Sequence, residues 1–544
     1  MPYRAWAIMV TNDPDIFLEV VERTLREAPR YHINRIEFHD FVFGSPSPEG
    51  FVENVVRYEA FERLKETREW RFLSDSVWLK DDKPPVSNER MDRNVEVFRK
   101  AARMVKAAGL KLNVWYHSFR EVPLELVEAY PDLMNPDSDF LFEASARILD
   151  EFFRKVPEVD GLTLTSLAET RSLAELPGKA ERKEKMQRFY QTAYDVCARH
   201  GRELILRDFG GEDDFWEVAE ALPREITFMT KWMPSDWERV HHPLNRKLKL
   251  AEPFKFVVEW DLRGEYLGEG FFPYVNPRHF WVNFHNVKLF NPHGCVGRVH
   301  WTDWKGKQYE WDSVFDSPNG LNAHVFSRAL CSTSRHRVTE IPAGVQAELL
   351  PFGWIQDWIV EHYGPEAWPG LWLIFNETPW MVESLCLSAD RYHSNHSFPQ
   401  LLPFEAPMKN VQAMLEEAGR AYIDADKRRV AERAVALREE VGALPGLSDT
   451  SKAKLERIFK VMAAFAHLHR ISVLLLADLQ LSLASAETSV DARIRLVDSA
   501  CEAMRSIARE LGGGMARMVE ERLDRDAPQL LEWVRGNGTS AMKR

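Results

Sequence analysis

Short apolar runs alternate with amphipathic segments over roughly the first 300 residues of the chain. Runs of four to eight apolar, β-branched or aromatic residues are typical of buried strands, whereas apolar residues spaced by three and four are typical of helices. The runs predict eight strands, at residues 3–10, 33–38, 110–116, within 159–170, 203–207, 226–232, 254–261 and 295–301.

Helical patterns lie between most of these strands, at residues 14–28, 94–108, 138–155 and 185–200. Strands that alternate with helices predict a parallel sheet, and eight of them favour a (β/α)8 TIM barrel over an open doubly wound sheet. No GxGxxG or GxxxxGK[ST] motif follows any of the strands, which argues against nucleotide-binding folds.

The pattern changes after Pro403 and Pro407, where Gly and Pro become sparse. Long amphipathic segments follow, at residues 411–441, 450–486 and 490–535. We therefore expect a catalytic barrel with a helical extension at 1–402, with the tryptophan-rich stretch 368–380 as a candidate cap, and an all-α helical bundle at 403–544.

Composition narrows the class of protein. The formal net charge of −12 over 544 residues disfavours a nucleic-acid or anionic-membrane partner. The five cysteines form no CxxC pair, which argues against a zinc site or a disulfide framework and fits a reducing compartment. No secretion signal is visible at the N-terminus, and we expect a cytoplasmic protein with no metal and no cofactor.

Polar residues follow the predicted strands where a TIM barrel carries its active site, at the carboxyl ends. The fourth strand is followed by Glu169, and the fifth ends in Arg207. The remaining strand ends contribute His117 after the third, Lys231, Trp232 and Asp236 at the sixth, and Glu259 and Glu265 at the seventh.

Cleavage of a glycosidic bond suits such a set of residues. It needs one protonated carboxyl group for the leaving oxygen and one carboxylate that activates water or attacks the sugar. Arg and Lys bind an anionic substituent, and an aromatic face such as that of Trp232 stacks on a sugar ring. The chain has no GxSxG motif of a serine hydrolase, and the adjacent His241 and His242 are poorly spaced as metal ligands.

Three segments resemble family 67 glycoside hydrolases, the inverting α-glucuronidases that release glucuronic or 4-O-methylglucuronic acid from xylan-derived oligosaccharides. LTSLAET resembles the family's VKANSEG, TKWMPSD its VKNGPID, and EWDLRGEYLG its EFQITQEYLG. The resemblance implies Glu169 as the general acid, with Asp236 and Glu265 as the base pair.

The same resemblance assigns the residues that hold the sugar. It implies that Arg207 and Lys231 bind the uronate and that Glu259 is a buried partner. The LNAHVFSRAL segment resembles the family's ANWYAFGRLA helix, and Asn322 within it is a further candidate for substrate binding. The resemblance also implies a homodimer through the C-terminal helices.

The chain departs from the family at two points. Thr165 stands where the family has a second uronate-binding lysine. The barrel pattern also begins within the first ten residues, so we expect no counterpart of the family's N-terminal β domain. Three readings stay open beside an α-glucuronidase: a glycosidase for another sugar, an inactive carbohydrate-binding barrel, and a metal-dependent lyase or isomerase acting on uronates.

Overall fold

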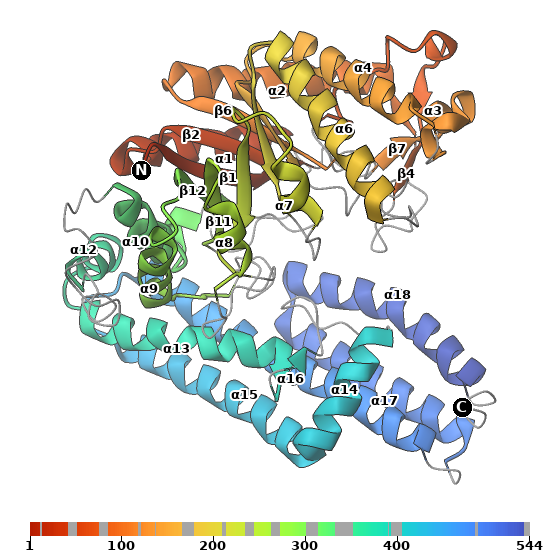
Figure 1. The fold of residues 1–544 in the computed structure, drawn as a ribbon. Helices are drawn as coiled ribbons and strands as arrows, with labels where there is room; N and C mark the ends of the chain where they lie inside the picture. Colours follow the sequence, from red (N-terminus) through yellow and green to blue (C-terminus); the bar gives the residue numbers. More distant parts are fainter. Residues whose placement is uncertain are drawn as a thin grey trace. The chain divides into compact units, whose positions relative to one another are not determined.

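The structure is a computed structural model, and it describes residues 1–10, 14–41, 52–74, 85–117, 121–135, 138–165, 179–208, 214–233, 244–262, 272–300, 314–331, 352–389, 391–392, 405–484 and 488–537. The chain divides into two compact units (Figure 1). The barrel unit consists of Met1–Arg263 and Pro277–Pro351, and the helical unit consists of Gly264–Asn276 and Phe352–Arg544.

Eight parallel strands close the barrel in the order β1-β12-β11-β10-β9-β8-β6-β2. Their bounds are β1 Tyr3–Val10, β2 Arg35–Phe41, β6 Lys111–Tyr116, β8 Gly161–Thr165, β9 Glu203–Arg207, β10 Thr227–Lys231, β11 Phe256–Asp261 and β12 Gly294–His300. Each predicted strand corresponds to one of these, so the predicted TIM barrel is confirmed.

Helices follow the barrel strands along the chain. They are α1 Pro14–Glu27, α2 Asn88–Ala107, α3 Leu124–Ala129, α4 Phe140–Lys155, α6 Lys179–Arg199, α7 Asp214–Ala219, α8 Lys247–Ala251, α9 Pro277–Lys288 and α10 Gly320–Cys331. Short 3-10 turns add η1 Ala28–Tyr31, η2 Glu62–Leu64, η3 Pro131–Met134 and η5 Val314–Asp316. Two small antiparallel pairs, β3 Glu69–Trp70 with β5 Val86–Ser87 and β4 Phe72–Ser74 with β7 Glu121–Pro123, lie outside the barrel sheet.

The barrel interior is packed with side chains of very different size. One buried cluster combines Tyr3, Ala5, Ala7, Trp115, Ile205, Met229, Val257 and Val296. The small residues on β1 leave space for the indole of Trp115 on β6, as close packing requires. Gly294 opens β12 beside Tyr3, and a Cβ at this position would lie 1.9 Å from the Tyr3 carbonyl oxygen.

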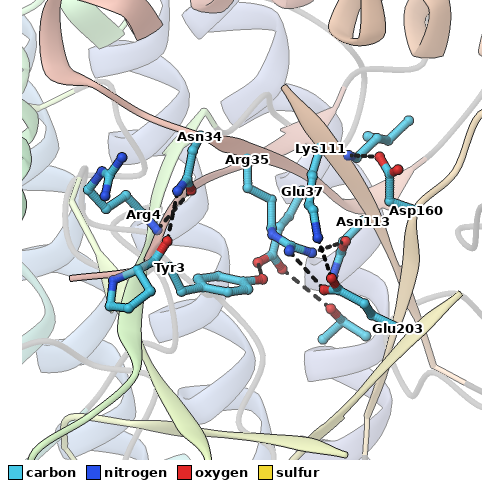
Figure 2. A network of polar contacts seen from close by, with 12 residues as sticks. Tyr3, Arg4, Asn34, Arg35, Glu37, Lys111, Asn113, Asp160 and Glu203 are labelled. Atoms are coloured by element: carbon cyan, nitrogen blue, oxygen red, sulfur yellow. Dashed lines mark hydrogen bonds and ion pairs between the residues drawn. The ribbon is translucent and has the colours of Figure 1, made fainter. Parts of the chain in front are cut away.

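Polar contacts occupy the amino-terminal end of the barrel (Figure 2). Arg35, the first residue of β2, donates to Asn113 and, at 2.8 Å, to the carboxylate of Glu203, the first residue of β9. Lys111 also pairs with Glu203, and Lys106 Nζ lies 2.7 Å from Asp160. These contacts join the starts of β2, β6 and β9 and tie α2 to the residue just before β8, which is a stabilising role at this end of a TIM barrel.

The helical unit contains α12 Phe352–Tyr363, α13 Trp368–Cys386, α14 Glu405–Glu417, α15 Gly419–Ala443, α16 Asp449–Ala484, α17 Val490–Leu511 and α18 Gly513–Asn537, with a strand pair β13 Leu387–Ser388 and β14 Arg391–Tyr392. Two of the three predicted long helices are each divided. Gly419 and Gly512 have φ values of +76° and +66°, a left-handed conformation that ends a helix and that glycine adopts without a steric penalty.

The unit boundary lies earlier than the predicted division at residue 402. Helices α12 and α13 belong to the helical unit, and so does the tryptophan-rich stretch predicted as a cap on the barrel. Contacts with α15 explain this: Arg433 pairs with Glu377 of α13, and the buried Lys427 donates to the carbonyl oxygens of Ser384 and Leu387. Helix pattern alone does not reveal which helices pack together.

Helix α16 is long and apolar enough, by length and composition, to cross a membrane. However, 72% of its most apolar 18-residue window is buried. Val473, Leu476 and Ala477 pack there with Val411 and Met414 of α14. Burial of this kind is typical of a core helix.

Candidate active site at the carboxyl end of the barrel

Polar side chains line the barrel interior at its carboxyl end. Side chains two residues apart in a strand share a face. Interior core residues on β9 to β12 are therefore followed, two positions on, by charged residues on the same face: Arg207 after Ile205, Lys231 after Met229, Glu259 after Val257 and Arg298 after Val296. The same rule places His39, His117, Thr165 and Asp261 on the interior face of β2, β6, β8 and β11.

Glu259 is the centre of a buried ion cluster. Arg207 binds its carboxylate in bidentate fashion, with Nε 2.7 Å from Oε2 and Nη2 3.1 Å from Oε1. Arg298 Nε lies 3.4 Å and Lys231 Nζ 3.9 Å from the same Oε1. Burial by itself would raise the pKa of Glu259, but the three cations outweigh it and hold that pKa well below its usual range.

The cluster brings together residues from four strands. The closed sheet places β10 between β9 and β11, and β12 on the other side of β11. Glu259 therefore has a cation on each neighbouring strand and a third from β9. Together with Asp261, 2% exposed, the strand residues of β9 to β12 provide three cations and two carboxylates at this end.

An aromatic residue lies directly beneath the cluster. The guanidinium carbon of Arg207 is 4.7 Å from the ring centroid of Trp115. The His39 ring lies 3.8 Å from the same indole, centroid to centroid, and His117 lies 6.0 Å from His39. Trp115 thus contacts both a cation and a histidine of the polar layer.

Asp208 follows β9 and forms a second buried ion pair. Lys247 of α8 donates to it at 2.7 Å, and Trp216 Nε1 donates to it at 3.1 Å. Burial raises the pKa of Asp208, although Lys247 opposes the rise. This pair joins the end of β9 to two neighbouring helices.

The three carboxylates predicted to perform the chemistry, Glu169, Asp236 and Glu265, lie outside the described residues. They belong to the segments that follow β8, β10 and β11. Their roles remain predictions.

Two predicted substrate-binding residues lie in other surroundings than expected. Trp232 is completely buried, its ring stacked on Trp260 at 5.3 Å and edge-on to His279 at 4.9 Å. It follows Lys231 and therefore points to the opposite, outer face of the sheet, so this packing argues against a sugar-stacking role. Asn322 of α10 is also completely buried and donates to the carbonyl oxygen of Leu262 at 3.1 Å, which makes it a support for the end of β11.

Arg298 is a functional candidate that the sequence analysis missed. The signal is present in the eighth strand, where Val296, Arg298 and His300 alternate with smaller or apolar residues. An arginine on the same strand face as a core valine indicates a buried ion pair. Within the described ranges, no group of three or more His, Cys, Asp or Glu side chains could hold a metal ion.

The fold and the polar layer define a TIM barrel with its candidate site at the carboxyl end of the strands. No protein-family model and no curated protein matches the sequence. Among solved structures, the chain is similar to a GH138 enzyme targeting pectin rhamnogalacturonan II, with a TM-score of 0.57 and 12% identity over 100% of this chain and 68% of that chain.

Further glycoside hydrolases are more distant. A Thermobaculum terrenum O-GlcNAc hydrolase mutant has a TM-score of 0.40 and 10% identity, covering 100% of this chain and 97% of that chain. An endo-β-1,4-mannanase from Thermotoga petrophila has a TM-score of 0.37 and 10% identity over 62% and 79% of the two chains. The likeness to the GH138 enzyme establishes a shared fold, and it does not distinguish family 67 from other families that use this barrel.

Proposed function

We propose that the chain is a glycoside hydrolase that acts at the carboxyl end of the barrel on a sugar bearing a carboxylate. The observation that carries the proposal is the cluster of Arg207, Lys231 and Arg298 around one carboxylate, Glu259. Cations fixed near the active-site face of a TIM barrel favour an anionic substituent on the substrate. The fold shared with a GH138 enzyme is consistent with this class of reaction.

The cations have different tasks in this proposal. Side-chain exposure is 2% for Arg207, 4% for Arg298 and 11% for Lys231. Arg207 is committed to Glu259 by two short hydrogen bonds. Lys231 therefore makes the direct contact with the sugar carboxylate, while Arg207 and Glu259 hold the surrounding positions. This revises the role that the resemblance implies for Arg207.

The chemistry comes from the carboxylates that follow the strands. Glu169 donates a proton to the leaving oxygen, and Asp236 and Glu265 orient and deprotonate the attacking water. Such a reaction inverts the anomeric carbon and needs a separation of about 6.5–9.5 Å between the acid and the base. An α-glucuronidase that releases glucuronic or 4-O-methylglucuronic acid is the finer form of the proposal, supported by the resemblance to family 67.

A screen of 4-nitrophenyl glycosides and aldouronic acids tests the proposal, with the anomer of the product followed by proton NMR. We expect hydrolysis with inversion, and a loss of several orders of magnitude in turnover on poor leaving groups in Glu169→Ala. Glu143→Ala, a change at an exposed carboxylate of α4, serves as the control. Undiminished turnover in Glu169→Ala contradicts the assignment, and saturable sugar binding without turnover makes the chain a carbohydrate-binding barrel instead.

A further inference from the structure

The indole of Trp115 connects the barrel core to the polar layer above it. It belongs to the interior core cluster and is 1% exposed. It also contacts two residues of the candidate site, the Arg207 guanidinium at 4.7 Å and the His39 ring at 3.8 Å. Any rotation of this indole therefore changes the space available to both side chains.

A buried carboxylate fixes the orientation of the indole. Glu37 of β2 accepts a hydrogen bond from Trp115 Nε1 and another from the Tyr3 hydroxyl, and Thr163 Oγ1 lies 3.4 Å away. Figure 2 shows the Tyr3 hydroxyl of β1 directed at the Glu37 carboxylate of the neighbouring strand β2. Burial raises the pKa of Glu37, while these hydrogen bonds and the nearby Arg35 oppose the rise. The carboxylate uses donors from three strands, β1, β6 and β8.

We propose that Glu37 and Trp115 are positioning residues of the candidate active site: Glu37 fixes the indole, and the indole sets the positions of Arg207 and His39. The proposal rests on the proposed function, since it gives the pair a role in holding a sugar. Neither residue touches the reacting atoms. Their effect reaches the site through Arg207, whose two hydrogen bonds orient Glu259 and, with it, the position of Lys231.

Trp115 is suited to both of its polar contacts, the one with Arg207 and the one with Glu37. A guanidinium over an indole face is attracted by the ring quadrupole, and the attraction is largest where water is excluded. Phenylalanine keeps a ring at this position but has a smaller face and no N–H for Glu37. Trp115→Phe therefore weakens both links while it leaves an apolar ring in the core.

A double-mutant cycle on the full chain tests the link to Arg207 without any substrate. Trp115→Phe and Arg207→Lys are combined, and unfolding is measured in urea. We expect coupling of at least about fivefold in the unfolding equilibrium constant. Trp70→Phe is the matched control, because Trp70 is equally buried and its Nε1 donates to Asn88 rather than Glu37. If Trp115→Phe shows no more coupling with Arg207→Lys than Trp70→Phe does, the inference is wrong.

Kinetics on the best substrate from the screen test the effect on the site. We expect Trp115→Phe and Glu37→Gln each to raise KM by about tenfold with a smaller change in kcat, and Trp70→Phe to change neither. Because Glu37 acts through the indole, Glu37→Gln should have no further effect on KM in the Trp115→Phe background. The positioning role is contradicted if the effects of Trp115→Phe and Glu37→Gln on KM multiply in the double variant. It is also contradicted if Trp115→Phe has the same KM and kcat as Trp70→Phe.

The two tests separate this inference from the proposed function. Absence of hydrolysis on every sugar of the screen defeats the proposed function, and the double-mutant cycle still decides whether Trp115 sets the position of Arg207. An additive cycle in an active glycosidase defeats this inference alone.

Discussion

Neutralising Glu259 is the sharpest perturbation of the ion cluster. In Glu259→Gln the side chain keeps its shape, and three buried cations lose their shared countercharge. Removing one partner of a buried ion pair costs about 3–5 kcal/mol, because the remaining charge is left in a medium of low dielectric constant. We expect a loss of that size in the free energy of unfolding of the barrel.

The pH dependence provides a second readout. Because the pKa of Glu259 lies well below its unfolded value, the carboxylate stabilises the fold above a pH of about 4–5, and this contribution is lost as the pH falls. The difference in stability between wild type and Glu259→Gln should therefore be constant near neutral pH. It should shrink by roughly 2 kcal/mol by pH 3.

Urea unfolding followed by circular dichroism, repeated from pH 7 to pH 3, measures both quantities. Glu143→Gln is the matched control, since Glu143 pairs with Arg147 across one helical turn at the surface, with side chains 54% and 35% exposed. Such a pair is worth less than about 1 kcal/mol. A cost for Glu259→Gln as small as that of the control, or a difference that does not change in acid, would refute the electrostatic account.

Two further predictions concern packing and a buried lysine. Gly294→Ala should destabilise the barrel by more than about 2 kcal/mol in urea unfolding, since its Cβ would meet the Tyr3 backbone, whereas Gly353→Ala in α12 meets open space and should stabilise the chain by about 0.5–1 kcal/mol. Equal effects in the two variants would contradict this. Burial lowers the pKa of Lys427 to about 8, so the unfolded chain binds more protons above that pH, and stability should rise by roughly 2 kcal/mol between pH 7.5 and pH 10 relative to Lys427→Met. Parallel stability curves for wild type and Lys427→Met would exclude this titration.

The sequence by itself determined the barrel and three of the charged residues at its carboxyl end. Apolar runs such as YRAWAIMV and FKFVVEWD identify strands because a strand buried on both faces has few polar positions. Eight such strands that alternate with helices favour a closed parallel barrel over an open sheet. Arg207, Lys231 and Glu259 were found in the same way, as charged residues at the ends of apolar strands.

Only the tertiary structure decided how these residues are used. Pairing of β12 with β11 adds Arg298 to the cluster, and packing inside the barrel assigns Arg207 of β9 to Glu259 of β11. The pleat turns Trp232 to the outer face, although its neighbour Lys231 faces inward. These contacts depend on which strands are neighbours and on which side chains point into the barrel. Both depend on residues far apart in the chain. The hydrophobic pattern predicts whether a segment is a helix or a strand, but it does not predict which other segments that element contacts.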